Sequence, residues 1–229
     1  MASESAAASS TFKKIQIQRD DTTFDAYVIG KEDAPGIVVL QEWWGVDYEI
    51  KNHAQKISQF EPGYKALIPD LYRGKVGLDV AEAQHLMDGL DWQGAVKDIQ
   101  ASVNWLKANG SQKVSNSIYP KLGSMSILLF VPWDSQETED AVFNGFLIRW
   151  IASTMDFCIQ TAKALEVKLK ASGVPHEVHI YPGLTHAFMN KSPEGLQRRK
   201  SMGLTDEDDV AVELAWTRFR NWMSRFLSP

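Results

Sequence analysis

The sequence feature that most constrains the fold is the stretch IVVLQEWWG at residues 37–45. Four apolar residues run without a polar break and stop at Gln41 and Glu42, and turn-forming residues bound the stretch on both sides. A short, continuously apolar run between turns is typical of a strand that helices cover on both faces, as in a parallel sheet. The sequence therefore predicts a buried central strand at residues 37–40.

Glu42, Trp43 and Trp44 follow the carboxyl end of this predicted strand. Ligands of open α/β sheets bind beyond the carboxyl ends of the strands, so a carboxylate and two indole rings are well placed to line a pocket. In the alternative interpretation, both tryptophans belong to the core and Glu42 is solvated. The local sequence favours the two interpretations equally.

Strand and helix patterns alternate along much of the chain, which indicates an α/β fold with a doubly wound, mostly parallel sheet. Residues 143–170 have the pattern of one long helix, whose first half is apolar all round. The other predicted elements are an antiparallel edge hairpin at 12–18 and 24–29, strands at 65–71, 126–132 and 176–181, and helices at 47–59, 79–90, 91–107 and 208–227.

The length and composition are those of an ordinary globular protein. With 229 residues, of which 44% are hydrophobic and 23% charged, the chain can bury a substantial core as one domain. We expect a disordered tail at residues 1–11 and a single domain at 12–229. The segment SNSIYPKLGS contains turn-forming residues and a proline. We therefore expect the central strand region, about 113–160, to be irregular.

Charge and cysteine content exclude some classes of protein. A net charge of −5 and a pI of about 5.6 argue against a nucleic-acid surface, and the basic run 198–200 is interpreted as a solvated face. The apolar stretch 141–152 is too short to span a membrane. The lone Cys158 cannot form an intramolecular disulfide, which favours a reducing compartment. We expect a cytoplasmic monomer with no membrane or nucleic-acid partner.

His186, in PGLTHAF, lies in a loop after a predicted strand near the end of the chain. An α/β hydrolase carries its general base at such a place, although a histidine of this kind alone is more often a surface residue. His176 and His179 are three apart on a strand and face opposite ways, which suits a metal poorly. With no Gly-x-Gly and no phosphate-loop lysine, we expect no metal and no cofactor.

A nucleophile is harder to find. The strained elbow of an α/β hydrolase needs Gly-x-Ser-x-Gly or Gly-x-Cys-x-Gly, and no two glycines of this chain are four apart. Cys158 has apolar neighbours within a predicted helix, which is typical of an inert thiol. Ser124 and Ser126 are possible substitute nucleophiles, and Asp134 is a possible substitute acid, but a structural role is favoured for both serines.

Four segments together resemble the dienelactone hydrolase (carboxymethylenebutenolidase-like) family. Among its members, this chain is similar in form to those of plants. They are IVVLQEWWGV, ALIPDLYRGKVGL, DWQGAVKDIQASVNWLKANG and HEVHIYPGLTHAFMN. The resemblance covers about residues 12–114 and 161–227. It implies an α/β-hydrolase fold and hydrolysis of a small-molecule lactone or ester by a Cys-His-Asp triad.

The resemblance also assigns roles to individual residues. His186 matches the general base of the family, Glu42 matches the glutamate that holds the resting cysteine, and the backbone N–H of Trp43 matches an oxyanion donor. Trp44 and Arg73 are then expected to bind substrate, although Arg73 is one position earlier than the family's carboxylate-binding arginine. Asn190 replaces a second arginine of some members, which argues against recognition of a carboxylated lactone.

The segment 115–160 departs from the family pattern, because it stands where the elbow and the triad acid would be. We interpret it as a divergent or replaced block, such as a misread exon. The first hypothesis is accordingly a lactone or ester hydrolase that is inactive or weak. The alternatives are a non-catalytic module that binds a small molecule beside the tryptophans, and a rewired hydrolase in which Ser124 or Ser126 attacks with Asp134 behind His186.

Overall fold

The computed structural model describes residues 9–111, 114–115, 128–130, 146–152, 166–167, 170–171, 176–181, 183–205 and 207–227. These belong to two compact units, Met1–Ser115 and Asn116–Pro229, and each unit is described by itself. The single domain expected at 12–229 stays a prediction. No helix in the described part of the chain is long and apolar enough to cross a membrane.

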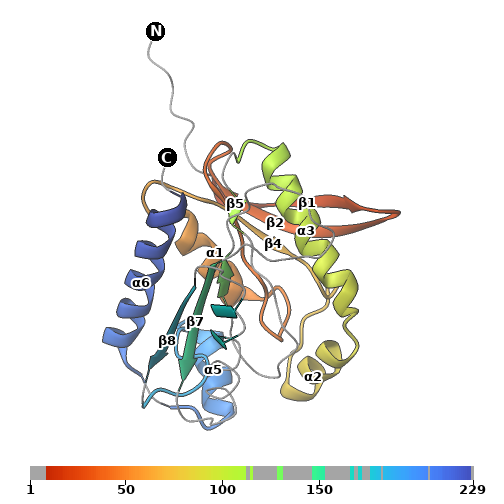
Figure 1. Ribbon diagram of the computed structural model, residues 1–229. Coiled ribbons are helices and arrows are strands. Elements are labelled where there is room, and N and C mark those ends of the chain that lie inside the picture. The colour runs from red at the N-terminus through yellow and green to blue at the C-terminus, as the bar shows by residue number, and fades with distance from the viewer. Residues whose placement is uncertain are drawn as a thin grey trace. The chain divides into compact units, whose positions relative to one another are not determined.

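The first unit contains a five-stranded sheet in the order β1-β2-β4-β3-β5 (Figure 1). The antiparallel hairpin is confirmed, with Ile17 opposite Phe24, and β1 begins before the predicted start at Phe12. β4 is antiparallel to β2 and parallel to β3, and β5 is parallel to β3. The strands are β1 (Ser9–Arg19), β2 (Thr22–Gly30), β3 (Gly36–Val38), β4 (Lys65–Pro69) and β5 (Val114–Ser115).

The predicted central strand is buried. Ile37, Val38 and Val39 have no exposed surface. β3 lies between β4 and β5, and the backbone N–H of Val39 extends the pairing by donating to the carbonyl of Leu67 at 2.8 Å. Burial on both faces explains why the apolar run shows no alternation.

Three helices of this unit begin where an aspartate caps them. Each carboxylate accepts a hydrogen bond from a backbone N–H of the first turn at about 3 Å. This N–H has no acceptor within the helix itself, so the aspartate supplies one. α1 packs against β2 and β4, and α3 packs against β1, β3, β4 and β5. The helices, all predicted from the sequence, are α1 (Tyr48–Ser58, cap Asp47), α2 (Val80–Asp88, cap Asp79) and α3 (Trp92–Ala108, cap Asp91).

A buried carboxylate on α3 joins three elements of the first unit. Asp98 is 1% exposed, and its two oxygens lie 2.7 Å from Nε of Arg19, at the end of β1, and 2.6 Å from Nη2 of Arg73, in the loop after β4. A charge in the interior is tolerated only where opposite charges and hydrogen bonds compensate its lost hydration.

The substitution Asp98→Asn tests this junction. It keeps the shape of the side chain but removes the charge that both arginines face, so the free energy of unfolding should fall by about 3 kcal/mol. Urea denaturation measures the change. Asp20→Asn is the matched control, because Asp20 also faces Arg19 but is 63% exposed, and it should cost less than about 1 kcal/mol. Equal effects of the two substitutions would contradict the assignment.

The second unit contains a three-stranded sheet in the order β6-β7-β8. β6 (Leu128–Phe130) is antiparallel to β7 (Phe146–Ala152), and β7 is parallel to β8 (Glu177–Tyr181), with Trp150 opposite His179. β6 and β8 lie within the predicted strands 126–132 and 176–181. The described residues of the region expected to be irregular, 113–160, are therefore strands, and its other residues lie outside the described part.

β7 overturns part of the predicted helix at 143–170. The segment FLIRWIA is apolar with β-branched and aromatic residues, and such a run fits a buried strand as well as a buried helix. Its parallel pairing with β8 decides for the strand. Residues 166–167 and 170 are helical, as predicted, and residue 171 is helical just beyond the predicted end.

The described residues of the second unit also form the helices α5 (Pro193–Ser201) and α6 (Asp209–Leu227). α6 was predicted, and its apolar stripe is buried. α5 was missed, although its start has a clear sequence pattern. Ser192 caps it by accepting the N–H of Gly195 at 2.9 Å, and a proline occupies the first position, where no N–H is needed. The buried residues of α6 are Val212, Ala215, Trp216, Phe219, Trp222, Met223 and Leu227.

Candidate functional site

Two loops meet at the carboxyl ends of β3 and β4. The Gln41 amide is 5% exposed, and its Oε1 accepts the backbone N–H of Leu71 at 3.0 Å. Gly45 closes the tight turn that begins at Glu42 and also pairs with Val76. Because Gly45 has a φ of +97°, and a Cβ there would lie 2.6 Å from a backbone oxygen, only glycine suits this turn. The parallel strands thus bring residues 41–45 and 71–76 together.

The Glu42–Trp43–Trp44 sequence divides between core and surface. Trp44 is 4% exposed and belongs to the core, while Glu42 and Trp43 are half-buried. The two indole rings are in edge-to-face contact, with centroids 5.0 Å apart. No described residue accepts a backbone hydrogen bond from the N–H of Trp43. The oxyanion role of this N–H stays a prediction.

The loop after β4 is held by a buried aspartate. Asp70 is 2% exposed, and its Oδ2 accepts the backbone N–H of Gly74 at 2.7 Å. Burial raises the pKa of the Asp70 carboxyl, and the hydrogen bond from Gly74 opposes this effect. Arg73, with a φ of +56°, turns back so that its Nη1 donates to the carbonyl of Asp70 at 3.0 Å. The loop conformation therefore fixes where the Arg73 guanidinium points.

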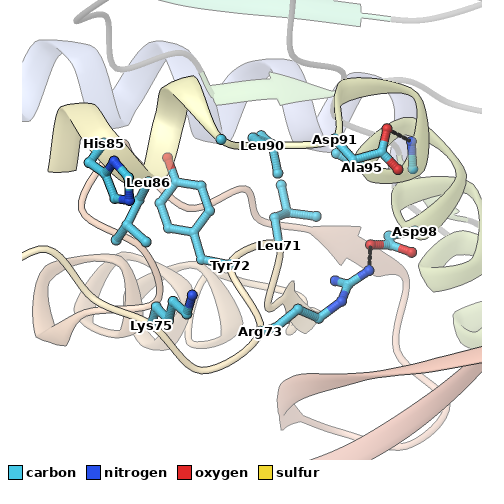
Figure 2. Close-up of a pocket in the computed structure, with 12 residues that line it drawn as sticks. Leu71, Tyr72, Arg73, Lys75, His85, Leu86, Leu90, Asp91, Ala95 and Asp98 are labelled. Atoms are coloured by element: carbon cyan, nitrogen blue, oxygen red, sulfur yellow. Dashed lines mark hydrogen bonds and ion pairs between the residues drawn. The ribbon is translucent and has the colours of Figure 1, made fainter. Parts of the chain in front are cut away.

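A pocket of about 450 Å³ lies beside this loop (Figure 2). The Arg73 guanidinium points to Asp98 at one end, and the Tyr72 ring and His85 lie toward the other. Since Asp98 already neutralises Arg73, a substrate carboxylate would have to share this cation. The pocket is lined by Leu71, Tyr72, Arg73, Lys75, His85, Leu86, Gly89, Leu90, Asp91, Gly94, Ala95 and Asp98.

In the second unit, His186 follows β8 in a tight turn at residues 186–189. Ala187 has a φ of +59°, and the N–H of Asn190 closes the turn onto the carbonyl of Ala187 at 2.9 Å. The Phe188 ring packs on Tyr181, with centroids 5.1 Å apart. No described residue forms a hydrogen bond with the His186 ring.

The surroundings of His186 keep it neutral. Its ring retains some accessible surface but is densely enclosed, and this burial, aided by the charge of Arg199, lowers the pKa of His186 to about 4. Arg199 lies on α5, is 2% exposed, and its Nη2 donates to Oγ1 of Thr185 at 3.1 Å. At neutral pH the imidazole is therefore in the form that accepts a proton.

The His186 pKa predicts a pH dependence of stability. The unfolded chain binds a proton at His186 below about pH 6.5, whereas the folded chain does so only below about pH 4. Stability should therefore fall as the pH drops from 6.5 to 4, by up to about 3 kcal/mol, and His186→Gln should remove this part of the slope. Urea denaturation of both proteins across this range is the measurement. Parallel pH profiles would contradict the expectation.

The five predicted site residues that the structure describes fall into two groups. Glu42, Trp43, Trp44 and Arg73 lie in the first unit, and His186 lies in the second. Ser124, Ser126 and Asp134 lie outside the described residues, as does Cys158. Among the side chains that the structure describes, no three His, Cys, Asp or Glu gather as a metal site would require.

Sequence reasoning missed two residues near these groups. Gln41 ends an apolar strand, and a polar residue at that place could have indicated its contact with the neighbouring loop. Arg199 was assigned to a solvated basic run, and this is wrong, because its side chain is buried. Nothing local distinguishes it from Arg198, since its burial depends on tertiary packing.

The alternation of strands and helices, with β3 parallel to β4 and β7 parallel to β8, defines the class of protein as α/β. The fold is similar to a dienelactone hydrolase-like promiscuous phosphotriesterase from metagenomic libraries, with a TM-score of 0.71, 19% identity, and coverage of 95% of this chain and 99% of that one. It is also similar to the dienelactone hydrolase from Anabaena variabilis, with a TM-score of 0.57, 12% identity, and coverage of 95% and 98%.

The family follows from the sequence match. The model of the dienelactone hydrolase family matches residues 24–118 and 134–227, and the chain belongs to this family. "Protein usf" of Aquifex pyrophilus is 26% identical over 188 residues, which cover 72% of this chain and 80% of that protein. The family match is interrupted between residues 118 and 134, where Ser124 and Ser126 lie. It resumes at residue 134, whereas the resemblance drawn from the sequence resumes only at residue 161. Residues 134–160 of the segment interpreted as a replaced block are therefore covered by the family match.

Proposed function

We propose that this chain is a hydrolase-family protein for small-molecule lactone or carboxylic ester bonds, with impaired catalysis. The observation that carries the proposal is the neutral, enclosed imidazole of His186 at the family's base position, in a sequence without a nucleophile elbow. A base without a nucleophile can still take a proton from water. Covalent catalysis, which divides one difficult step into two easier ones, is lost.

The residual chemistry of such a site can be stated by residue. Water attacks the ester carbonyl while His186 accepts its proton. The tetrahedral intermediate then collapses, and the leaving alkoxide takes the proton back from the His186 imidazolium. Arg199 disfavours the imidazolium that forms, because both are cations. Because no carboxylate among the described residues pairs with the ring to offset this charge, His186 is a weak base, and only a residual rate is expected.

Rapid-mixing kinetics with 4-nitrophenyl acetate tests this proposal. We expect slow, linear release of nitrophenol without a burst, because no acyl-enzyme accumulates. His186→Gln should lower the residual rate about a hundredfold, the usual worth of a general base, while Ser124→Ala, Ser126→Ala and Cys158→Ala leave it unchanged.

The matched control is His179→Gln, which removes an imidazole on β8 that pairs with Glu177 at 3.0 Å. It should leave the rate as it is. A burst of about one nitrophenol per chain would contradict the proposal. Its loss in Ser124→Ala or Ser126→Ala would favour the rewired hydrolase, with Asp134 behind His186.

The pocket in the first unit favours a second candidate, a module that binds an apolar or aromatic small molecule without catalysis. Its volume of about 450 Å³ falls within the range of about 300–1,000 Å³ that is usual for ligand sites. Three leucines and Ala95 give the pocket an apolar part. Trp43 and Trp44 do not line it, but this pair lies in the same unit and offers a fluorescence signal. The pocket does not use His186.

A fluorescence titration with 2-naphthoate distinguishes this module from a hydrolase. Ala95→Leu places a larger side chain in the pocket, so it should abolish binding, while Ala101→Leu on the same helix is the control and should not. His186→Gln should also leave binding intact. Loss of binding in His186→Gln, with Ala95→Leu unaffected, would count against the module.

We also propose the setting in which the protein acts. The acidic net charge and the lone cysteine support a cytoplasmic monomer that acts on small molecules and not on nucleic acid. The four segments that carry the family resemblance support a plant-type member.

A further inference from the structure

Arg199 differs from its neighbours in the basic run of α5. Its side chain is 2% exposed, whereas Arg198 is half-buried and Lys200 is exposed. Burial of a guanidinium costs free energy, because the charge loses its hydration. A basic run that only solvates the surface would not need a buried guanidinium. The burial of Arg199 therefore points to a function within the second unit.

The contact of Arg199 points to the loop that carries His186. Nη2 donates to Oγ1 of Thr185, the residue immediately before the histidine, at 3.1 Å. The anchor itself is rigid, because Arg199 lies within α5, and its carbonyl accepts the N–H of Leu204 at 2.9 Å just beyond the helix. The hydrogen bond from Arg199 therefore restrains the residue next to His186.

We propose that Arg199 is a positioning residue for His186, which fixes the loop through its hydrogen bond to Thr185. The inference rests on the proposed function, in which His186 is the base. It adds a residue 13 positions after His186 in the sequence, which affects both the position of the imidazole and its basicity.

Electrostatics agrees with this geometry. Burial is the larger cause of the lowered His186 pKa, and Arg199 is the one charged side chain among those described that lowers it further. Arg198 and Lys200 lie on the same helix and do not contribute. The arginine therefore acts on the ring in two separable ways, through a hydrogen bond to Thr185 and through its charge.

Histidine titration by proton–carbon NMR measures the charge effect, with His186→Gln to assign the signal. Arg199→Gln should raise the His186 pKa by about one unit, the usual effect of removing a nearby like charge. Arg199→Lys keeps the charge and should leave the pKa low. Arg198→Gln removes the same charge from the adjacent position, and we expect it to behave as the unchanged protein does.

Thr185→Val measures the positioning effect. It removes the acceptor while keeping the shape and the buried cation, so the His186 pKa should stay low while the ring's chemical shift and the His186-dependent ester rate change, the rate falling about tenfold. An unchanged ring signal and rate in Thr185→Val would overturn the positioning role.

Arg199→Gln with an unchanged pKa, or Arg198→Gln with an equal rise, would overturn the electrostatic role. If Arg199→Gln does not fold, Thr185→Val still tests the positioning role, because it keeps the buried cation and removes only the acceptor on Thr185. The titration needs no activity, so a protein without ester hydrolysis but with the expected pKa shifts would refute the proposed function alone.

Discussion

The parallel pairing of β3 with β4 is the interaction on which the first unit depends. It buries the apolar run completely, and it makes both strands end at the same edge of the sheet. The turn at 41–45 and the loop at 71–76 therefore meet, and the Gln41 amide joins them. The half-buried Glu42, the Trp43 N–H and the Arg73 guanidinium owe their positions to this meeting of two loops.

The first half of the fold follows from local sequence because its determinants are local. An uninterrupted apolar run between turns predicts a covered strand, and aspartates before amphipathic segments predict three capped helices. The residues of the site that lie in these loops, Glu42 to Trp44, could be placed from the sequence for the same reason. Whether Trp44 is core or pocket could not, since that depends on what packs against it.

The second half was less predictable for physical reasons. The segment 146–152 is apolar in a way that suits a strand or a helix, and only its partner strand decides between them. The burial of Arg199 is likewise a property of packing, and a run of three basic residues gives no indication of it. The family resemblance placed His186 without revealing what determines its protonation.

These features agree with the proposal of a hydrolase scaffold that has a base and no assigned nucleophile. The enclosed imidazole is neutral and competent to accept a proton, but the nearby cation makes the protonated form costly. In a complete triad an acidic partner would offset that cost. Here the sequence offers no elbow, and the family match is broken in the region where the substitute serines lie.

The most direct test of this account is intact-mass spectrometry after incubation with diethyl 4-nitrophenyl phosphate, which traps an activated serine or cysteine as a stable phosphoryl adduct. The account predicts an unmodified mass after prolonged exposure to excess reagent. One diethylphosphoryl group per chain, absent from His186→Gln, would contradict it, because it would show that the imidazole does activate a nucleophile.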